Sequence, residues 1–387
     1  MVASVLPYPP LGGAEKRTLR LLEAMIRAGA LPTLVVTSTP DPEAAAALGE
    51  RGVKVEVAAE PRPGPLRRLE QHVARRPSPY VPRLARLVGD WVTARRPAFV
   101  QFEHTQNAYY LRRARGAPTV LSLHNVDSEM VATLAGAARP GSVERLRLRN
   151  RAHAMRTTER RAARAADLVV CVSGEDLAAL GEVGGEGIVV PNGVDDALFA
   201  IDPEPPGAET VLFFGRYDYE PNALGISRFL REGWAAVAAR RPDARLRLVG
   251  PGIDPELAAL AAATERVDLA GPVERIETAI AGAAVVAVPI WQGGGTRLKV
   301  LEALAAARPV AGTPLGVSGI GFVDGEHGLV ASEPAGLGEA IAKLLADREL
   351  AARLAVGGRG LADRFRWRLA TEPLERRYRG WVDGEGS

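Results

Sequence analysis

Cysteine is almost missing from this chain of 387 residues, which has only Cys171. A disulfide within the chain is therefore excluded, and the cysteine spacing of a metal cluster is absent. Cys171 lies in an apolar run at residues 168–172, which is typical of a buried strand. We expect its thiol to be a core side chain rather than a nucleophile.

Long apolar runs are also missing. No stretch reaches the roughly 18 to 20 apolar residues that cross a bilayer, and the run at residues 2–6 is too short for a signal peptide. The chain also lacks G-x-S-x-G, H-E-x-x-H, C-x-x-C and the P-loop lysine motif, which argues against the enzyme classes that use them. These absences predict a cytoplasmic protein, with peripheral contact at the inner face of a membrane left open.

The two halves of the chain differ in charge. Residues 1–195 carry 27 Lys and Arg against 20 Asp and Glu, a net charge of +7, whereas residues 196–387 carry 22 against 26, a net charge of −4. A basic half suits an anionic partner, such as a phosphorylated acceptor or a membrane face. The alternative is a set of solvated arginine-rich helices, as at residues 139–164. Nucleic acid is a poorer partner, because no aromatic residues are interleaved with the arginines.

The length of the chain favours two domains, because single cores stop growing beyond about 250–300 residues. The segment Ala200-Ile-Asp-Pro-Glu-Pro-Pro-Gly-Ala208 reads as a linker, since its prolines remove backbone donors. We predict an N-terminal domain at residues 1–195, a linker at 196–208 and a C-terminal domain at 209–365. Residues 366–387 are predicted to form a helix that packs back on the N-terminal domain.

Strand-length apolar runs alternate with helix-period runs in both halves. This pattern predicts an α/β fold of two doubly wound parallel sheets that face each other across a cleft. The predicted strands are 2–6, 33–37, 53–57, 99–102, 119–123, 168–172 and 188–190, then 210–214, 245–249, 267–270, 285–289 and 309–311. The predicted helices are 14–28, 81–95, 143–166 and 174–180, then 222–240, 255–263, 274–281, 297–306 and 336–347.

The segment Gly293-Gly-Gly-Thr-Arg-Leu-Lys299 is the most informative in the chain. It follows a strand-like run and opens onto a helix-like run that contains Glu302. Its glycines leave backbone N–H groups uncovered beside a helix N-terminus, where the helix dipole favours an anion. Arg297 and Lys299 add two cations, so the segment predicts a site for a diphosphate with an attached sugar.

Arg216 follows a predicted strand directly after Gly215. Its planar guanidinium suits a phosphate group, because it can bond two oxygens at once. Asp218 and Glu220 superficially resemble a metal-binding pair. With Arg216 adjacent, a turn and a helix cap are the better interpretation.

Two histidines occupy comparable positions in the first half. His124 and His104 each follow an apolar strand, with Glu103 and Gln106 as potential sugar-bonding neighbours of His104. A structural role for either histidine is the alternative. Near the N-terminus, Gly13 ends a glycine pair that joins a strand to a helix, but the G-x-G-x-x-G spacing of a nicotinamide site is incomplete.

Taken in order, these motifs resemble those of the retaining glycosyltransferases of family GT4, which have the GT-B fold. The resemblance covers nearly the whole chain. It implies a sugar nucleotide bound mainly by the C-terminal domain and an acceptor bound mainly by the N-terminal one. The matching pieces are Pro10-Leu-Gly-Gly13, Val190-Pro-Asn-Gly-Val194, Phe214-Gly-Arg216, Gly271-Pro-Val273 and the run from Gly293 to Glu302.

The resemblance also implies roles for individual residues. Arg216, Arg297 and Lys299 would neutralise the donor diphosphate, and Glu302 would bond the ribose hydroxyls. His124 matches the histidine that reaches the transferred sugar, and it forms the expected catalytic set with Arg216 and Lys299. The other expected donor-binding residues are Gly13, Gly293, Gly294, Gly295 and Thr296, with Pro272 and Val273 beside the base. The expected acceptor-binding residues are Tyr8, Glu103, His104 and Gln106, and Trp291 and Gln292 would border the sugar pocket.

The sequence departs from the family pattern at two places. Gly294 stands where many members carry the first of two glutamates, so the carboxylate that would touch the donor sugar is missing. The segment at residues 217–223 lacks the lysine that many members place after the equivalent of Arg216. Arg297 and Lys299 could supply that charge.

The resemblance implies transfer of a sugar with retention at the anomeric carbon, with neither a metal nor a cofactor. The acceptor would be a natural product, a glycolipid or a polysaccharide. Two alternatives remain: a catalytically silent nucleotide-sugar-binding protein, or another GT-B enzyme such as a sugar-nucleotide epimerase or a phosphorylase.

Overall fold

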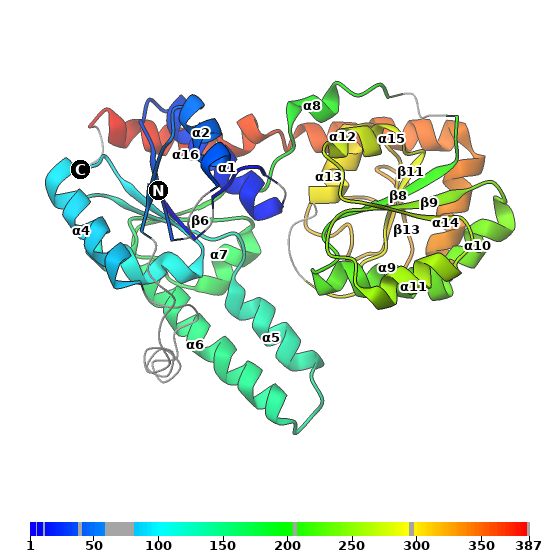
Figure 1. Ribbon diagram of the computed structural model, residues 1–387, viewed down its shortest axis with the longest axis horizontal. Coiled ribbons are helices and arrows are strands. Elements are labelled where there is room, and N and C mark those ends of the chain that lie inside the picture. The colour runs from blue at the N-terminus through cyan, green and yellow to red at the C-terminus, as the bar shows by residue number, and fades with distance from the viewer. Residues whose placement is uncertain are drawn as a thin grey trace. The chain divides into compact units, whose positions relative to one another are not determined.

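The computed structural model describes residues 1–4, 6–10, 12–37, 41–58, 81–203, 207–293 and 298–384. The chain divides into two compact units, of which one is Met1–Pro191 with Ala370–Ser387 and the other is Asn192–Leu369. The described residues of the 196–208 segment belong to the second unit. Each unit contains a parallel sheet with helices on both faces (Figure 1). The predicted doubly wound α/β fold is therefore confirmed.

The first unit has a seven-stranded sheet with the order β3-β2-β1-β4-β5-β6-β7. β1 pairs with both β2 and β4, so the strand order reverses there, and sheets of this kind bind ligands beside such a point. The strands are β1 (Val2–Ala3), β2 (Thr33–Val36), β3 (Lys54–Val57), β4 (Val100–Glu103), β5 (Thr119–Ser122), β6 (Leu168–Cys171) and β7 (Glu186–Val189). The helices are α1 (Gly13–Arg27), α2 (Pro42–Glu50), α4 (Pro82–Arg95), the 3₁₀ helix η1 (Thr105–Arg113), α5 (Asp127–Ala137), α6 (Val143–Ala165), α7 (Gly174–Leu180) and most of α16 (Trp367–Val382).

Successive residues of a strand face opposite sides of this sheet. Leu34 of β2 belongs to a core with α1, α2 and α16, whereas its neighbour Val35 belongs to a core with α4, η1, α6 and α7. The last helix, α16, contributes Leu374, Tyr378 and Trp381 to the first of these cores. The final residues of the chain therefore complete the core of the N-terminal unit.

The second unit has a six-stranded sheet with the order β10-β9-β8-β11-β12-β13. Because β8 to β11 are parallel neighbours, their carboxyl ends lie along one edge. The strands are β8 (Thr210–Phe214), β9 (Arg245–Val249), β10 (Val267–Gly271), β11 (Val285–Val288), β12 (Val310–Gly312) and β13 (Leu329–Val330). The short helix α8 (Asp196–Phe199) comes before β8. One face of the sheet is covered by α9 (Glu220–Glu232), α10 (Trp234–Arg240), α11 (Pro255–Ala263) and α14 (Pro334–Ala346). The other face is covered by α12 (Ile276–Ala281), α13 (Leu298–Ala305) and α15 (Arg348–Asp363) (Figure 1).

One predicted helix is divided in two. The sequence predicts a single helix over residues 222–240, but α9 and α10 are separate helices that meet at Gly233. A Cβ atom at Gly233 would lie 2.5 Å from the carbonyl oxygen of Pro334. The close approach of α14 explains why glycine occupies this position.

Helices α5 and α6 form a hairpin that extends away from the first sheet (Figure 1). Val131 packs with Ala152 and Met155 between the two helices. The Ser142 side chain caps α6 by accepting a 3.1 Å hydrogen bond from the backbone N–H of Arg145. Among the described residues, no helix has both the length and the apolar character needed to cross a bilayer.

Candidate functional site

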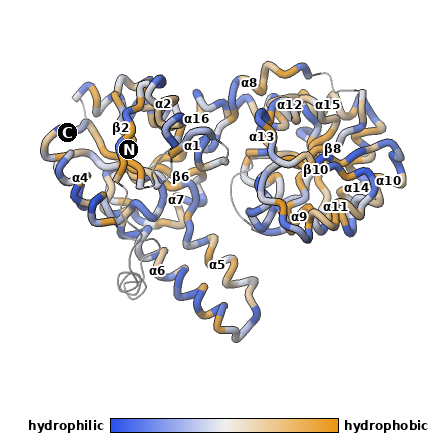
Figure 2. The backbone as a smooth tube through the Cα atoms, viewed as in Figure 1, coloured by the Kyte–Doolittle hydropathy of each residue, from blue (hydrophilic) through white to orange (hydrophobic). Residues whose placement is uncertain are grey.

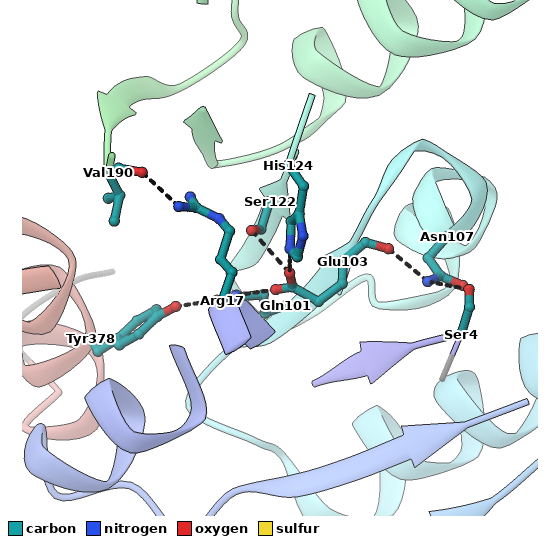
Figure 3. Close-up of polar contacts among 9 residues, drawn as sticks. All are labelled: Ser4, Arg17, Gln101, Glu103, Asn107, Ser122, His124, Val190 and Tyr378. Atoms are coloured by element: carbon teal, nitrogen blue, oxygen red, sulfur yellow. Dashed lines mark hydrogen bonds and ion pairs between the residues drawn. The ribbon is translucent and has the colours of Figure 1, made fainter. Parts of the chain in front are cut away.

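The candidate site in the first unit is centred on Glu103, at the carboxyl end of β4. Its carboxylate is fully buried; Oε2 lies 2.6 Å from Nε2 of His124 and accepts a 3.2 Å hydrogen bond from the Ser122 hydroxyl. Oε1 accepts a hydrogen bond from the side-chain amide of Gln101 (Figure 3). Glu103 lies opposite Ser122 in the β4–β5 ladder. This register brings the end of β5, and with it His124, to the carboxylate.

The imidazole rings of His104 and His124 are in contact, with centroids 3.9 Å apart and planes tilted by 48°. Burial lowers the pKa of His124 well below its usual value, and burial together with the neighbouring His124 lowers the pKa of His104 to about 3. Both rings are therefore neutral at neutral pH. Nδ1 of His124 is buried, and no described residue bonds to it. If Nε2 donates to Glu103, Nδ1 carries a lone pair that can accept a hydrogen bond from a ligand hydroxyl.

A buried cation accompanies the Glu103 carboxylate. The guanidinium of Arg17, on α1, is fully buried and donates a 2.8 Å hydrogen bond to the carbonyl of Val190. Burial lowers the pKa of Arg17 to about 10, so it stays charged at neutral pH. Burial raises the pKa of Glu103, while hydrogen bonding from Gln101 and the charge of Arg17 oppose that rise. The two histidines therefore adjoin a buried carboxylate and a buried guanidinium.

The other N-terminal residues of the predicted site make contacts of their own. The Gln106 amide donates a 2.5 Å hydrogen bond to the Ser4 hydroxyl, at the junction of β1 and β4. Tyr8 instead lies beneath the guanidinium of Arg51, 4.8 Å from the ring centre. Gly13 is the first residue of α1. The structure therefore brings Glu103, His104 and His124 into contact and places Gln106 at the strand reversal.

In the second unit, Asn222 connects the Lys299 ammonium to the backbone of Arg216. The Lys299 ammonium donates a 2.6 Å hydrogen bond to Asn222 Oδ1 and lies 4.3 Å from the centre of the Phe213 ring. The Asn222 amide nitrogen donates a 2.6 Å hydrogen bond to the carbonyl of Arg216. A Cβ atom at Gly215 would lie 2.9 Å from that amide nitrogen and 3.2 Å from the ammonium. The end of β8, the start of α9 and the start of α13 converge here.

The Arg216 guanidinium makes two hydrogen bonds to Asp218, of 3.0 and 2.5 Å. Hydrogen bonding from Arg216 lowers the pKa of Asp218. The two side chains are 47% and 49% exposed, and exposed ion pairs of this kind contribute little to stability. A diphosphate can therefore replace Asp218 as the partner of Arg216 at small cost.

The glycine segment begins at the same edge of the sheet. Gly293 has φ +100°, and a Cβ atom there would lie 2.4 Å from Cγ of Pro221, in the first turn of α9. Pro272 and Val273 directly follow β10, and Glu302 is buried on α13. Gly294, Gly295, Thr296 and Arg297 lie outside the described residues.

Trp291 and Gln292 precede this segment. The Trp291 indole donates a 2.6 Å hydrogen bond to the carbonyl of Ser332, and the guanidinium of Arg228 lies 4.9 Å from the centre of its ring. Gln292 is exposed. Trp291 is thus anchored to its own unit, beside the first described residue of the glycine segment.

Sequence reasoning missed most of the polar side chains around Glu103. Gln101 and Ser122 lie within runs predicted as buried strands, and a polar residue in such a run is a signal that it has a buried partner. Tyr378 is 277 residues from Gln101, to which it is hydrogen-bonded. No local pattern could have connected these two residues.

Two known protein-family models match this chain, one in each half. Residues 11–198 match the family model described as Glycosyltransferase Family 4, and residues 208–347 match the model described as Glycosyl transferases group 1. The chain belongs to glycosyltransferase family 4. The resemblance inferred from the ordered motifs is therefore confirmed.

Curated relatives of this GT4 chain include two mannosyltransferases. It is 29% identical over 218 residues to the phosphatidyl-myo-inositol mannosyltransferase of Mycolicibacterium smegmatis, a match that covers 53% of this chain and 54% of the relative. It is 28% identical over 205 residues to the protein of the same name from Mycobacterium leprae, covering 51% and 54%. The chain thus spans about half the length of the curated relatives it matches.

Solved structures extend the likeness to the complete fold. The Anabaena protein HepE in complex with UDP and glucose matches with a TM-score of 0.67 at 18% identity, over 97% of each chain. Sucrose-phosphate synthase from Thermosynechococcus elongatus matches with a TM-score of 0.70 at 19% identity, over 99% of this chain and 98% of that one. At these identities the likeness concerns the fold, and the two units of the GT4 chain are the Rossmann-like domains of a GT-B protein.

Proposed function

We propose that this GT4 protein transfers a sugar from a nucleotide diphosphate to a hydroxyl acceptor, with retention at the anomeric carbon and without a metal. The observation that carries the proposal is the convergence of Arg216, Asn222 and Lys299 at the carboxyl edge of the second sheet. Family membership supports glycosyl transfer, and the complexes of HepE with UDP and UDP-glucose support a nucleotide-sugar donor.

The donor would be held along this edge. Arg216 and Lys299, with Arg297 from the glycine segment, would neutralise the diphosphate. Glu302 would accept hydrogen bonds from the ribose, and the backbone at Pro272 and Val273 would contact the base. The remaining glycines of the segment and Thr296 would donate to the phosphates.

The difficult step is the departure of the diphosphate, because negative charge builds up on it as the sugar–oxygen bond breaks. Cations that are already in place stabilise that charge without reorganisation. The acceptor hydroxyl would attack the same face of the anomeric carbon, and its proton would pass to the departing phosphate oxygen. No protein nucleophile takes part. His124, in the first unit, would contact the transferred sugar as a neutral imidazole.

A thermal-shift panel of uridine, guanosine, adenosine and thymidine diphosphates and their sugars tests donor binding. One nucleotide should raise the melting temperature of the wild type. Arg216→Ala and Lys299→Ala should abolish that shift, whereas Lys343→Ala, at an exposed lysine of α14 in the same unit, should retain it. If no nucleotide stabilises the protein, the glycosyltransferase proposal fails.

Turnover then separates the remaining alternatives. A transferase should transfer the sugar to an acceptor, or slowly hydrolyse the donor when no acceptor is present. Binding without either reaction would identify a silent nucleotide-sugar-binding protein. Conversion of the donor sugar without an acceptor would identify an epimerase, and turnover with inorganic phosphate a phosphorylase.

The proposal includes peripheral contact with an anionic lipid surface through the α5–α6 hairpin. Val143 and Leu146, in the first turns of α6, are 66% and 60% exposed, and Leu134 of α5 is 45% exposed. Residues 139–151 contain five arginines and one glutamate, a net charge of +4. Each basic side chain near an anionic leaflet contributes about 1 kcal/mol of attraction. Figure 2 shows α6 as a mainly hydrophilic helix with isolated apolar positions, so charge would supply most of its attraction to a lipid surface.

Cosedimentation with vesicles at low salt tests this contact. The protein should bind vesicles that contain phosphatidylserine and remain free in pure phosphatidylcholine. Leu146→Ser and Arg147→Glu should each weaken binding, while Val356→Ser, at a 73% exposed valine of α15, should not. If the wild type ignores anionic vesicles, the lipid contact fails while the donor assignment stands.

A further inference from the structure

A series of buried hydrogen bonds connects the last helix of the chain to His124. The Tyr378 hydroxyl, on α16, donates to the side-chain oxygen of Gln101 on β4. The Gln101 amide nitrogen donates to Glu103 Oε1, and Glu103 Oε2 lies 2.6 Å from His124 Nε2 (Figure 3). Each of these side chains is at most 6% exposed, so water does not compete for the bonds.

The donor and acceptor groups of these side chains decide which residue donates at each bond of the series. Because the Tyr378 hydroxyl donates to the amide oxygen of Gln101, the NH₂ group of Gln101 faces Glu103. An ionised Glu103 carboxylate then accepts from Gln101, Ser122 and His124, so that the imidazole proton lies on Nε2 and a lone pair is left on Nδ1. Without the tyrosine hydroxyl, the amide oxygen would be buried without this donor, and the amide would be held only by its bond to Glu103.

The Tyr378 ring is held by packing that does not depend on its hydroxyl. Phe99, directly before β4, stacks on it with centroids 4.6 Å apart and planes 5° apart. Glu375, on the same helix, accepts hydrogen bonds of 2.9 and 2.5 Å from Arg27 of α1. The hydroxyl can therefore be removed while the ring stays in place.

We propose that Tyr378 and Gln101 are positioning residues for His124. They orient the Glu103 carboxylate, which fixes the tautomer and the ring orientation of His124. The proposal rests on the proposed function, in which His124 contacts the transferred sugar. Helix α16 would then support catalysis through Tyr378, in addition to packing in the core of the first unit.

Nitrogen-15 NMR of the imidazoles tests the positioning role without a substrate. The chain has five histidines, few enough to resolve, and His124→Gln identifies the signals of His124. The wild type should show a neutral ring with the proton on Nε2 at pH 7. Tyr378→Phe, which keeps the stacking on Phe99, and Gln101→Leu should shift the ring toward the other tautomer or into exchange between the two. Unchanged His124 signals in both folded variants would overturn the proposal.

Kinetics with the donor found in the thermal-shift panel provide the second readout. Loss of one hydrogen bond is expected to lower kcat by about 3- to 10-fold in Tyr378→Phe. Gln101→Leu, which removes both neighbouring bonds, should be lower still. The KM for the donor and the thermal shift should stay close to the wild-type values, because the residues proposed to hold the nucleotide diphosphate lie outside the series. A rise in KM at constant kcat would contradict the proposal.

Tyr110→Phe is the matched control. Tyr110 is another buried tyrosine of the first unit, and its hydroxyl accepts a 2.8 Å hydrogen bond from the backbone N–H of Val81. This variant should leave the His124 signals and kcat unchanged. If the NMR signals change as expected but no donor is turned over, the proposed function fails while the positioning of the ring stands. If turnover is normal in Tyr378→Phe and Gln101→Leu, the positioning role fails and the proposed function stands.

Discussion

The side-chain oxygen of Asn222 accepts a 2.6 Å hydrogen bond from the ammonium of Lys299, which ties the start of α9 to the start of α13. Asn222 is nearly buried and is itself held by the carbonyl of Arg216. The ammonium is thus fixed at the strand ends before any ligand binds. A cation that is already ordered loses less entropy when a diphosphate arrives.

Removal of the Asn222 amide should therefore weaken donor binding. Asn222→Ala takes away this acceptor for Lys299, and we expect the dissociation constant of the preferred nucleotide to rise by about tenfold, since hydrogen bonds to charged groups contribute roughly 1.5–3 kcal/mol. Isothermal titration calorimetry measures the change. Asn150→Ala, on the exposed face of α6, is the control. Equal affinities in the two variants would contradict the role of Asn222.

Gly293 should not tolerate a side chain. Its φ of +100° disfavours other residues, and a Cβ atom would lie 2.4 Å from Pro221. Gly293→Ala should lower the free energy of unfolding by about 1–3 kcal/mol and weaken nucleotide binding. Pro221→Ala in the same chain should recover only a small part of the loss, because it removes Cγ but leaves Cβ of residue 221 at 2.8 Å and leaves the backbone strain. Gly360→Ala, in open space on α15, should be neutral or stabilising, and similar denaturation curves for the two glycine variants would argue against this explanation.

Stability should decrease as the pH falls from about 6.5. Burial depresses the pKa of His104 to about 3 and that of His124 well below its usual value, so the unfolded chain binds protons that the folded chain does not. Each histidine should reduce the free energy of unfolding by up to about 1.4 kcal/mol per pH unit in this window. The raised pKa of Glu103 acts in the opposite direction over its own range.

Urea denaturation at pH 7, 6 and 5 measures this slope. His104→Asn is the informative variant, because asparagine keeps a polar side chain at this position and does not titrate. Its slope should be smaller than that of the wild type by about 1.4 kcal/mol per pH unit. Parallel slopes would show that His104 titrates normally in the folded chain.

The Cys171 thiol should be unreactive in the folded protein. It is fully buried on β6, and burial raises its pKa to about 12, which leaves little thiolate at pH 8. A disulfide reagent that reports on free thiols should give no signal until urea is added, and one equivalent afterwards. Rapid labelling without urea would show that the strand opens.

The regular part of the fold could be predicted because burial on both faces makes parallel strands read as apolar runs. The predicted strands 210–214 and 245–249 coincide with β8 and β9. The sequence did not predict α5 or η1. α5 is rich in alanine and has few large apolar residues, so its helical period is weak, and the 3₁₀ geometry of η1 has no 3.6-residue period.

The sequence could predict those residues of the candidate site that come just after a strand. His124 and Arg216 each come after a strand, and parallel strands end at a common edge, so their placement follows from topology. Their partners depend on tertiary packing. Asn222 lies six residues from Arg216 but 77 from Lys299, and only the folded sheet shows that it joins them.

The path of the chain through its two units has a consequence for biosynthesis. The second unit is one continuous stretch, Asn192–Leu369, whereas the first is completed by residues from Ala370 onward. On the ribosome, the surface that later contacts Leu374 and Trp381 stays uncovered while the intervening residues are made, which takes roughly 10 to 40 s at common elongation rates. The half of the protein that is translated first is therefore the half that matures last.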